Sequence, residues 1–296
     1  MTNRDTLHKQ EIFSLKNIVV SGLVLFYIIF IIIPISIAFV GSFHQWNPLK
    51  GTYTFNGIEN YIRVFNNELF WSSLSNTLVF TFVVILFRII IGLGIALILY
   101  SSIVRCKTFF RAAFYMPVVT PLVAVSFIWV WMYNPQMGLI NQILGTHNNW
   151  LVNKDTALGS IMVMTIWKDY GYAVVLFLAG LYSLPKDCYE AAKIDGASGV
   201  KLFKYITLPL LKPMTLFVVI TSIISYLQTY IQILVMTEGG PGTSTYVTSY
   251  LIFDEAFVKY NFGYASAISF IMFIVIGMLT FISFKISSEK GGQGNE

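Results

Sequence analysis

Charge is the component in which this sequence is poorest. Only 11% of its 296 residues are charged, whereas 56% are hydrophobic, and the mean hydropathy is +0.71. A soluble domain is about one quarter charged. Because hydrocarbon cannot solvate charge, we expect an integral membrane protein rather than a soluble protein with a very apolar core.

Metal-ligand and catalytic patterns are also missing. The two cysteines, Cys106 and Cys188, fall in segments that we assign below to the cytoplasm, where thiols stay reduced, so both are expected to be free. The three histidines (His8, His44 and His147) are scattered, and no metal site is expected. The net charge of +5 does not indicate a nucleic-acid partner. The sequence has no Gly-Lys-Ser or Gly-Lys-Thr, no nucleophile triad and no paired catalytic carboxylates, so we expect no catalytic residue, no cofactor and no ATP hydrolysis by this chain.

Long apolar stretches are what the sequence has instead. A bilayer span needs about 20 residues. Six stretches are long enough: 17–40, 74–100, 112–133, 157–180, 214–236 and 265–284. The first is too long for a signal-peptide core and lacks a small-residue cleavage site after it, so it is expected to be retained. The pattern predicts an all-α membrane protein with six transmembrane helices.

The connecting segments predict the orientation of these helices. One alternate set carries thirteen positive residues: Arg4, Lys9, Lys16, Arg105, Lys107, Arg111, Lys186, Lys193, Lys201, Lys204, Lys212, Lys285 and Lys290. The other set carries four: Lys50, Arg63, Lys154 and Lys259. Positive residues stay on the cytoplasmic side, so both termini and the 181–213 segment are expected there. The organisation predicted is a cytoplasmic segment at 1–16, a membrane domain at 17–285 and a cytoplasmic tail at 286–296, of which 291–296 are expected to be disordered.

Aromatic and small residues agree with spans that pack together. Five aromatic residues near the outer ends of the predicted helices indicate an interfacial belt: Trp46, Trp71, Trp131, Tyr133 and Trp150. Gly92, Gly94 and Ala96 form a smooth strip on which another helix can pack closely.

The cytoplasmic segment 181–213 has its own helical pattern. Pro185 suits a first helical turn with Ser183 as a cap, and Asp195-Gly196 is expected to break the first helix with a turn. Ser198 is expected to cap a second helix with an apolar stripe, which Pro209 and Pro213 would end. The prediction is a short helical hairpin at the membrane surface, and periodicity alone leaves open whether it is only an anchor for the loop.

The residues of this hairpin resemble the EAA loop of ABC importer permeases. The resemblance rests on Glu190-Ala191-Ala192, Asp195-Gly196-Ala197, Phe203, Ile206, Leu208-Pro209 and Pro213. In that family the loop forms coupling helices that dock in a groove of a cytoplasmic ATPase. The resemblance implies that Glu190, Ala191, Ala192, Asp195, Gly196, Ala197, Phe203 and Pro209 carry ATPase coupling.

Three other segments resemble the maltose-type carbohydrate permeases of that family. They are residues 57–61 with Asn76-Thr77, residues 115–117 leading to 134–141, and residues 238–242 with Ser244-Thr245. The resemblance runs from about residue 17 to residue 284. It implies a bacterial inner-membrane subunit that pairs with a different sister permease and with two copies of an ATPase that uses ATP and Mg. It also implies an extracytoplasmic solute-binding protein, met by 41–73 and 237–264, and a sugar or oligosaccharide substrate. The large extracytoplasmic insertion of the maltose protein is absent.

Three ionisable residues fall at membrane depth: Arg88, Lys168 and Asp169. Such residues are functional candidates, because a charge at mid-bilayer costs about 2.5–3.5 kcal/mol on insertion scales. Thr165, Lys168, Asp169 and Tyr172 share one helix face, and Ser222, Ser225, Tyr226 and Thr229 have the same spacing, bordered by Gln228 and Gln232. These two faces, with Arg88, are expected to line a substrate path, and the corresponding positions of the maltose-type permeases line the sugar site.

Alternatives to a substrate path stay open. The charged residues can instead pair with one another or with the sister subunit, and the hydroxyls can bond back to their own helices. If Lys168 pairs with Asp169, Arg88 is left to bind an acidic group such as a uronate. If Arg88 pairs with Asp169, the ligand is neutral; we favour this arrangement because an unpaired buried arginine is costly. A secondary transporter or a membrane enzyme would require mirrored broken helices or clustered catalytic groups, and neither is identified.

Overall fold

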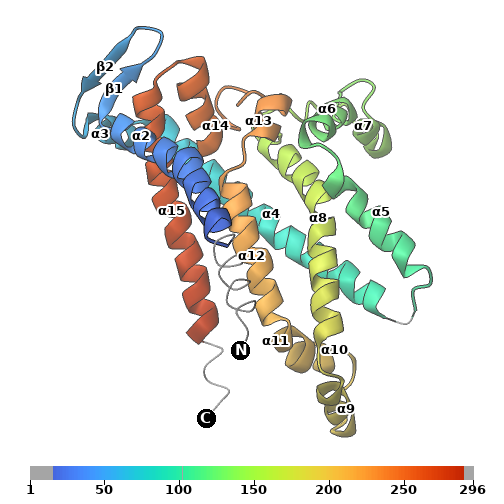
Figure 1. Cartoon of the computed structure of the whole chain (residues 1–296). Coiled ribbons are helices and arrows are strands. Elements are labelled where there is room, and N and C mark those ends of the chain that lie inside the picture. Colours follow the sequence, from blue (N-terminus) through green and yellow to red (C-terminus); the bar gives the residue numbers. More distant parts are fainter. Residues whose placement is uncertain (1–15, 102, 290–296) are drawn as a thin grey trace, which may run out of the picture. The chain divides into compact units, whose positions relative to one another are not determined.

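The computed structural model describes residues 16–101 and 103–289 (Figure 1). The predictions for 1–15, which include His8, and for the tail at 290–296 lie outside the described residues. The chain divides into two compact units. The first contains residues up to 66 and 255–270, and the second contains 67–254 and the residues from 271 onward.

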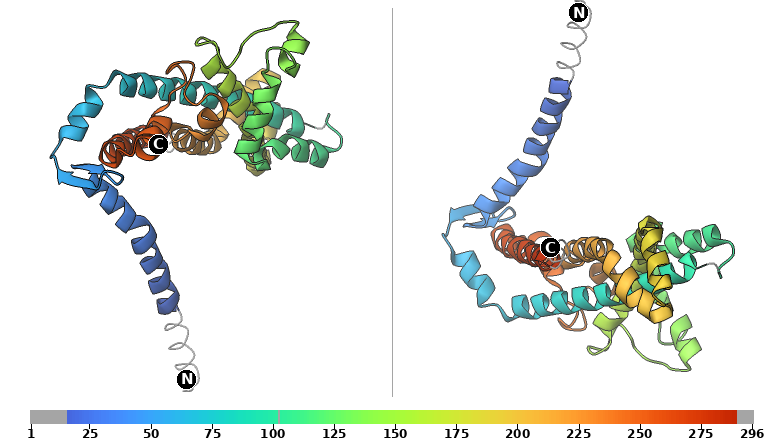
Figure 2. Two further views of the ribbon diagram at one scale, coloured as in Figure 1. Left: turned by 90° about the horizontal axis from the view of Figure 1, so that it is seen from above. Right: turned by 90° about the horizontal axis from the view of Figure 1, so that it is seen from below.

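The first unit begins with an apolar helical run, Lys16–Gly41, which includes the π-helical turn η1 (Ile28–Ile32) and α2 (Ile33–Gly41). Figure 2 shows this run leading into a β-hairpin. The short helix α3 (Glu59–Phe65), the π-helical turn η3 (Asp254–Val258) and the start of α15 (Phe262–Glu289) complete the unit, except that Asp254 belongs to the second unit. Asn60 of α3 is buried and its amide donates to the carbonyls of Ser42 and His44, which ties α3 to the hairpin.

The hairpin corrects the all-α prediction. Strands β1 (His44–Asn47) and β2 (Thr52–Phe55) pair antiparallel, with His44 opposite Phe55 and Asn47 opposite Thr52. Gly51 has φ +62°, a conformation that glycine adopts freely, and the Lys50 N–H donates to Asn47 Oδ1. Stacking of His44 on Tyr53, with ring centroids 4.3 Å apart, adds a cross-strand contact. Two four-residue strands are too short for periodicity to predict.

The second unit is built on α4 (Glu68–Tyr100) and α8 (Ala157–Ser183), two long unbroken helices. A Cβ added at Gly92 of α4 would lie 2.6 Å from the Cβ of Ala173 on α8, so the glycine permits this close approach. Ala96 is fully buried, whereas Gly94 has open space. Close packing on the predicted small-residue strip is therefore present at Gly92 and Ala96, and no helix of the described chain packs on Gly94.

Two predicted spans are not single straight helices. The third is divided into α5 (Lys107–Val119) and α6 (Leu122–Met132), which are bent by 94°. Thr120, between them, is extended at ψ 134° because it precedes Pro121, which disfavours the helical conformation of its neighbour. The fifth is divided into α12 (Lys212–Leu227) and α13 (Ile231–Met236), so 228–230 are not helical. In the described chain four helices are long and apolar enough to cross a membrane, or up to six if two bent pairs, α5 with α6 and Gly199–Leu210 with α12, each count as one span.

The 181–213 segment forms α9 (Lys186–Ile194), α10 (Gly199–Leu202), the π-helical turn η2 (Phe203–Thr207) and α11 (Leu208–Leu210). Three details of the prediction are wrong. Ser183 ends α8, and its hydroxyl donates to the Gly180 carbonyl instead of capping α9. Ser198 occupies the N-cap of α10 without a side-chain hydrogen bond. Pro213 lies in the first turn of α12, where a missing N–H is tolerated, rather than at a helix end, whereas Pro209 stands one residue before the end of the helical run Gly199–Leu210, as predicted.

The remaining short helices, α7 (Leu139–Leu144) and α14 (Thr248–Phe253), lie in connections next to α6 and α13. Buried Asn141 links the α7 connection: its amide donates to the Asn134 and Asn148 carbonyls, and its oxygen accepts from the Trp150 indole at 2.8 Å. Tyr133 is 5% exposed and donates to the Ser160 carbonyl. Its place in an interfacial belt is therefore wrong, whereas Trp71 and Trp131 are exposed as such a belt requires.

Candidate functional site

The second unit brings the three predicted intramembrane ionisable residues into one cluster. Arg88 comes from α4, Lys168 and Asp169 come from α8, and Ser222 and Tyr226 come from α12. We call these five residues, with Tyr172 of α8, the polar cluster. Close packing of α4 against α8 and α12 forms it, so side chains separated by as many as 138 positions meet.

Arg88 reaches Asp169 through a tyrosine. The Arg88 Nη1 donates to Ser222 Oγ at 2.9 Å and to the Tyr226 hydroxyl at 3.1 Å. The same hydroxyl donates to Asp169 Oδ2 at 3.1 Å. Because one lone pair of the hydroxyl accepts from a cation, its proton is directed to the carboxylate. The expected direct pair of Arg88 with Asp169 is therefore replaced by a pair bridged by Tyr226.

Aromatic rings complete the surroundings of the guanidinium. Its carbon lies 5.2 Å from the ring centroid of Tyr172 and 5.6 Å from that of Tyr226. Arg88 is only 6% exposed, and ring faces stabilise a desolvated cation. Its Nε has no hydrogen-bond partner within the described chain.

Lys168 is held differently. Its Nζ donates to the Val118 carbonyl at 3.2 Å and lies 3.8 Å from Asp169 Oδ1. Val118 is in the last turn of α5, where helix carbonyls lack intrahelical partners. Sequence reasoning missed this contact, although Pro121 was a signal that the helix stops there. The expected pairing of Lys168 with Asp169 is present only as a contact longer than a hydrogen bond.

The remaining residues of the two predicted polar helix faces are only partly connected by hydrogen bonds. Gln232 of α13 donates to Thr229 at 3.1 Å and to Thr165 at 3.5 Å, which links the non-helical 228–230 to α8. Thr165, Ser222 and Ser225 also donate to the carbonyl four residues earlier in their own helices, as the alternative interpretation expected. Ser225 and Gln228 are exposed and are not joined to the polar cluster by these bonds.

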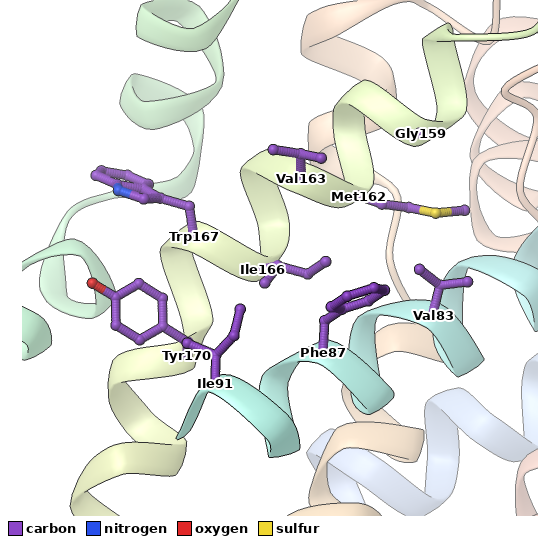
Figure 3. Close-up of a pocket in the computed structure, with 9 residues that line it drawn as sticks. All are labelled: Val83, Phe87, Ile91, Gly159, Met162, Val163, Ile166, Trp167 and Tyr170. Carbon is purple, nitrogen blue, oxygen red and sulfur yellow. The ribbon is translucent and has the colours of Figure 1, made fainter. Parts of the chain in front are cut away.

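A separate groove lies between α4 and α8 (Figure 3). Its volume is about 440 Å³, and nine residues line it: Val83, Phe87, Ile91, Gly159, Met162, Val163, Ile166, Trp167 and Tyr170. None belongs to the polar cluster. A hydroxyl-rich molecule would lose its hydrogen bonds against such a lining. The polar cluster is therefore the stronger candidate for recognition of a hydrophilic substrate.

The segment that resembles a coupling loop has a well-defined turn. Gly196 has φ +79°, the Ala197 N–H donates to the Ala192 carbonyl at 2.8 Å and the Asp195 N–H donates to the Ala191 carbonyl at 3.1 Å. These bonds close the end of α9 with a glycine in the left-handed region, as in a Schellman motif. Ala192 is buried, Ala197 and Phe203 are half-buried, and Glu190, Ala191, Asp195 and Pro209 are exposed.

Two of the quoted motifs meet in the N-terminal part of α4. The Asn76 amide donates to the Ser244 and Tyr246 carbonyls at 3.1 and 2.9 Å. The Thr77 hydroxyl accepts from the Thr248 N–H at 2.8 Å. The motif at 76–77 thus anchors the connection between α13 and α14. This structural role was not evident from the spacing of the motif in the sequence.

Comparison with known proteins decides the family. A family model described as "Binding-protein-dependent transport system inner membrane component" matches residues 88–290, which include the polar cluster and the 181–213 segment. The chain belongs to this family. The resemblance to importer permeases is thereby confirmed, and the chain is a membrane permease subunit of a binding-protein-dependent ABC importer.

Individual relatives agree over most of the chain. The trehalose/maltose transport system permease protein MalF of Thermococcus litoralis is 36% identical over 88% of this chain and 88% of its own length. The arabinooligosaccharides transport system permease protein AraP of Bacillus subtilis is 32% identical over 92% of this chain and 88% of its own. A bacterial ABC transporter involved in the import of the acidic polysaccharide alginate has the same fold, with a TM-score of 0.82 at 20% identity over 96% of this chain and 99% of its own.

Proposed function

We propose that this subunit forms the translocation path for a sugar or oligosaccharide in a bacterial inner membrane, with the polar cluster as the substrate-contacting part of the path. The observation that carries the proposal is the polar cluster itself, which places hydroxyl, carboxylate and aromatic groups together between apolar helices. Sugars are recognised by hydrogen bonds to their hydroxyls and by rings that stack on their apolar faces. Two relatives named for sugar transport, MalF and AraP, support this substrate class.

The non-helical residues 228–230 support the same location. A backbone that leaves the helix at membrane depth is tolerated only where it is buried in protein or lines a polar cavity. Thr229, within this stretch, is 9% exposed and bonds to Gln232. The predicted path residues Thr165, Ser225 and Thr229 would then extend the polar cluster towards α13.

The topology proposed has six spans, in which α5 with α6 and α12 with α13 each form one, with both termini and the 181–213 segment in the cytoplasm. Residues 17–285 would form the permease domain, and the segments at 41–73 and 237–264 would face the binding protein. The exposed Glu190, Asp195 and Gly196 on the α9 turn would dock on the ATPase. The partners proposed are a different sister permease and two copies of an ATPase, which supplies the ATP and Mg chemistry. No cofactor or metal is proposed for this chain.

Purification of the assembled complex tests the proposal. The chain, tagged and expressed in its own host, is expected to copurify with a second permease and an ATPase. After reconstitution into nanodiscs, ATP hydrolysis is expected to rise when the binding protein is added with a sugar that it binds. A complex without an ATPase, or hydrolysis stimulated only by loaded binding proteins for amino acids, would contradict the proposal.

A further inference from the structure

The three charges of the polar cluster differ in their exposure. The side chain of Asp169 is 27% exposed, that of Lys168 is 10% exposed, and Arg88 as a whole residue is 6% exposed. The carboxylate is therefore the ionised group that an incoming molecule meets most readily. The two cations are buried among fixed partners.

Both cations are already engaged. Arg88 donates to two hydroxyls and has the rings of Tyr172 and Tyr226 near its guanidinium. Lys168 donates to a helix-end carbonyl. An acidic ligand would have to displace the Lys168 contact or reach the buried Nε of Arg88, which has no partner in the described chain, and it would approach past a carboxylate.

The formal charge of the cluster, two cations and one anion, is net positive and would by itself favour an acidic ligand. Distance decides between the two effects, because Coulomb energy falls with separation and water at an opening screens the more distant charges. A ligand that touches the exposed Asp169 is closest to the negative charge. The local field at the point of contact is therefore expected to be negative.

Asp169 is also oriented to accept hydrogen bonds. Its Oδ2 accepts from Tyr226, whose proton is directed there by Arg88. Its Oδ1 lies 3.8 Å from Lys168, too far for a hydrogen bond, so the lone pairs of this oxygen stay available. An ionised carboxylate only accepts, which suits hydroxyl donors and repels a uronate or a phosphate.

We propose that Asp169 is a specificity-determining residue that selects neutral sugars, by accepting hydrogen bonds from sugar hydroxyls, and excludes acidic ones. Tyr226 and Arg88 are positioning residues that hold the carboxylate for this contact. Since it concerns the same site, the proposal rests on the function proposed above, and it adds the charge class of the substrate.

Charged thiol reagents test the sign of the local field without knowledge of the sugar. Ser225 is exposed and lies three residues after Ser222 on α12, so a cysteine there lies at the exposed edge of the polar face. The purified complex would carry Ser225→Cys with Cys106→Ser and Cys188→Ser, and the same complex without Ser225→Cys serves as the blank. The rate at which this cysteine is modified is measured with a cationic and with an anionic methanethiosulfonate of similar size. Each rate is divided by the rate at which the same reagent reacts with 2-mercaptoethanol in solution. Because the same thiolate attacks both reagents, forming a disulfide and releasing methanesulfinate, the ratio cancels any change in thiol reactivity.

The expected result is a faster normalised rate for the cationic reagent. Adding Asp169→Asn is expected to lower the cationic-to-anionic ratio about tenfold, as removal of one incompletely screened charge should. Tyr226→Phe, which releases the carboxylate, is expected to lower the ratio about threefold, a change that a merely structural role would not produce. Asp155→Asn is the matched control, because Asp155 is exposed just before α8 begins, and it should leave the ratio unchanged.

Three outcomes would overturn the proposal. A faster anionic reagent would mean that Arg88 and Lys168 dominate the field and favour an acidic substrate. A ratio that does not respond to Asp169→Asn would show that Asp169 does not determine the field at the exposed edge of the polar face. Absence of reaction with both reagents would show that the face is closed to water-soluble molecules. Loss of the ATPase on purification would instead contradict the proposed function, and the two failures are therefore distinguishable.

Discussion

The polar cluster and the α9 turn hold polar residues in opposite ways. In the cluster, Arg88 is buried and bonded to other side chains of the same subunit. At the α9 turn, Glu190 and Asp195 are exposed, and the apolar Ile194 beside them is 87% exposed. A buried charge requires partners within its own chain, whereas an exposed polar and apolar surface is available to another protein. Changes in the cluster should therefore act first on the subunit, and changes at the turn on its association.

The largest effect on stability is expected from Arg88→Gln. Removal of one member of a buried charged network leaves the others uncompensated, at about 3–5 kcal/mol. We expect a lower apparent melting temperature of the purified complex, measured by size-exclusion chromatography after heating, and loss of uptake. Arg88→Lys keeps the charge and should lose less. Equal stability of the wild type and the glutamine variant would mean that the cluster is not a stabilising network.

Tyr226→Phe should have a smaller effect. It keeps the ring beside Arg88 but removes the hydroxyl that bridges Arg88 and Asp169. The lost hydrogen bonds to buried charged groups are expected to destabilise the subunit by about 1–3 kcal/mol. Tyr170→Phe is the matched control, because it also removes a tyrosine hydroxyl but Tyr170 lines the apolar groove and does not belong to the polar cluster. Heat stability of each variant complex measures the difference, and a tyrosine variant as stable as the wild type would argue that the bridge is dispensable.

Gly196→Val should act on the turn with less effect on the rest of the subunit. A β-branched residue at φ +79° is strained by about 1–2 kcal/mol. Because a Cβ at Gly196 would meet open space, the strain is confined to the backbone. We expect less ATPase bound per permease after purification and reduced uptake, while the melting temperature of the permease changes little. Gly196→Asn is the control, since asparagine tolerates this conformation; normal uptake by the valine variant would exclude a coupling role for the turn.

The smallest effect on folding is expected from Glu190→Gln. Glu190 is exposed on α9, and surface substitutions usually change stability by less than about 0.5 kcal/mol. If Glu190 meets a basic group of the ATPase, binding-protein-stimulated ATP hydrolysis should fall and should become less sensitive to salt. Asp187→Asn, also exposed on α9, is the control. Identical hydrolysis in both variants would place the docking contact elsewhere.

Much of the membrane architecture could be predicted because apolar length is a local property. The helices at 74–100 and 157–180 were predicted within the long helices α4 and α8. The bend between α5 and α6 was missed although Pro117 and Pro121 were visible, because a hydropathy window averages over a proline. The hairpin at 44–55 was missed because its strands are short and its stabilising contacts with Asn60 come from a separate helix.

The sequence by itself determined that this is a membrane protein of the importer permease family, that three ionisable residues fall within its long apolar stretches, and that Gly196 allows a turn. These features depend on composition, motif spacing and the conformational freedom of one residue. Only the tertiary structure decided how the charges are connected. A helical period places Asp169 on a face but does not state which side chain of α4 or α12 meets it, and the rotation and close approach of packed helices placed the Tyr226 hydroxyl between Arg88 and Asp169.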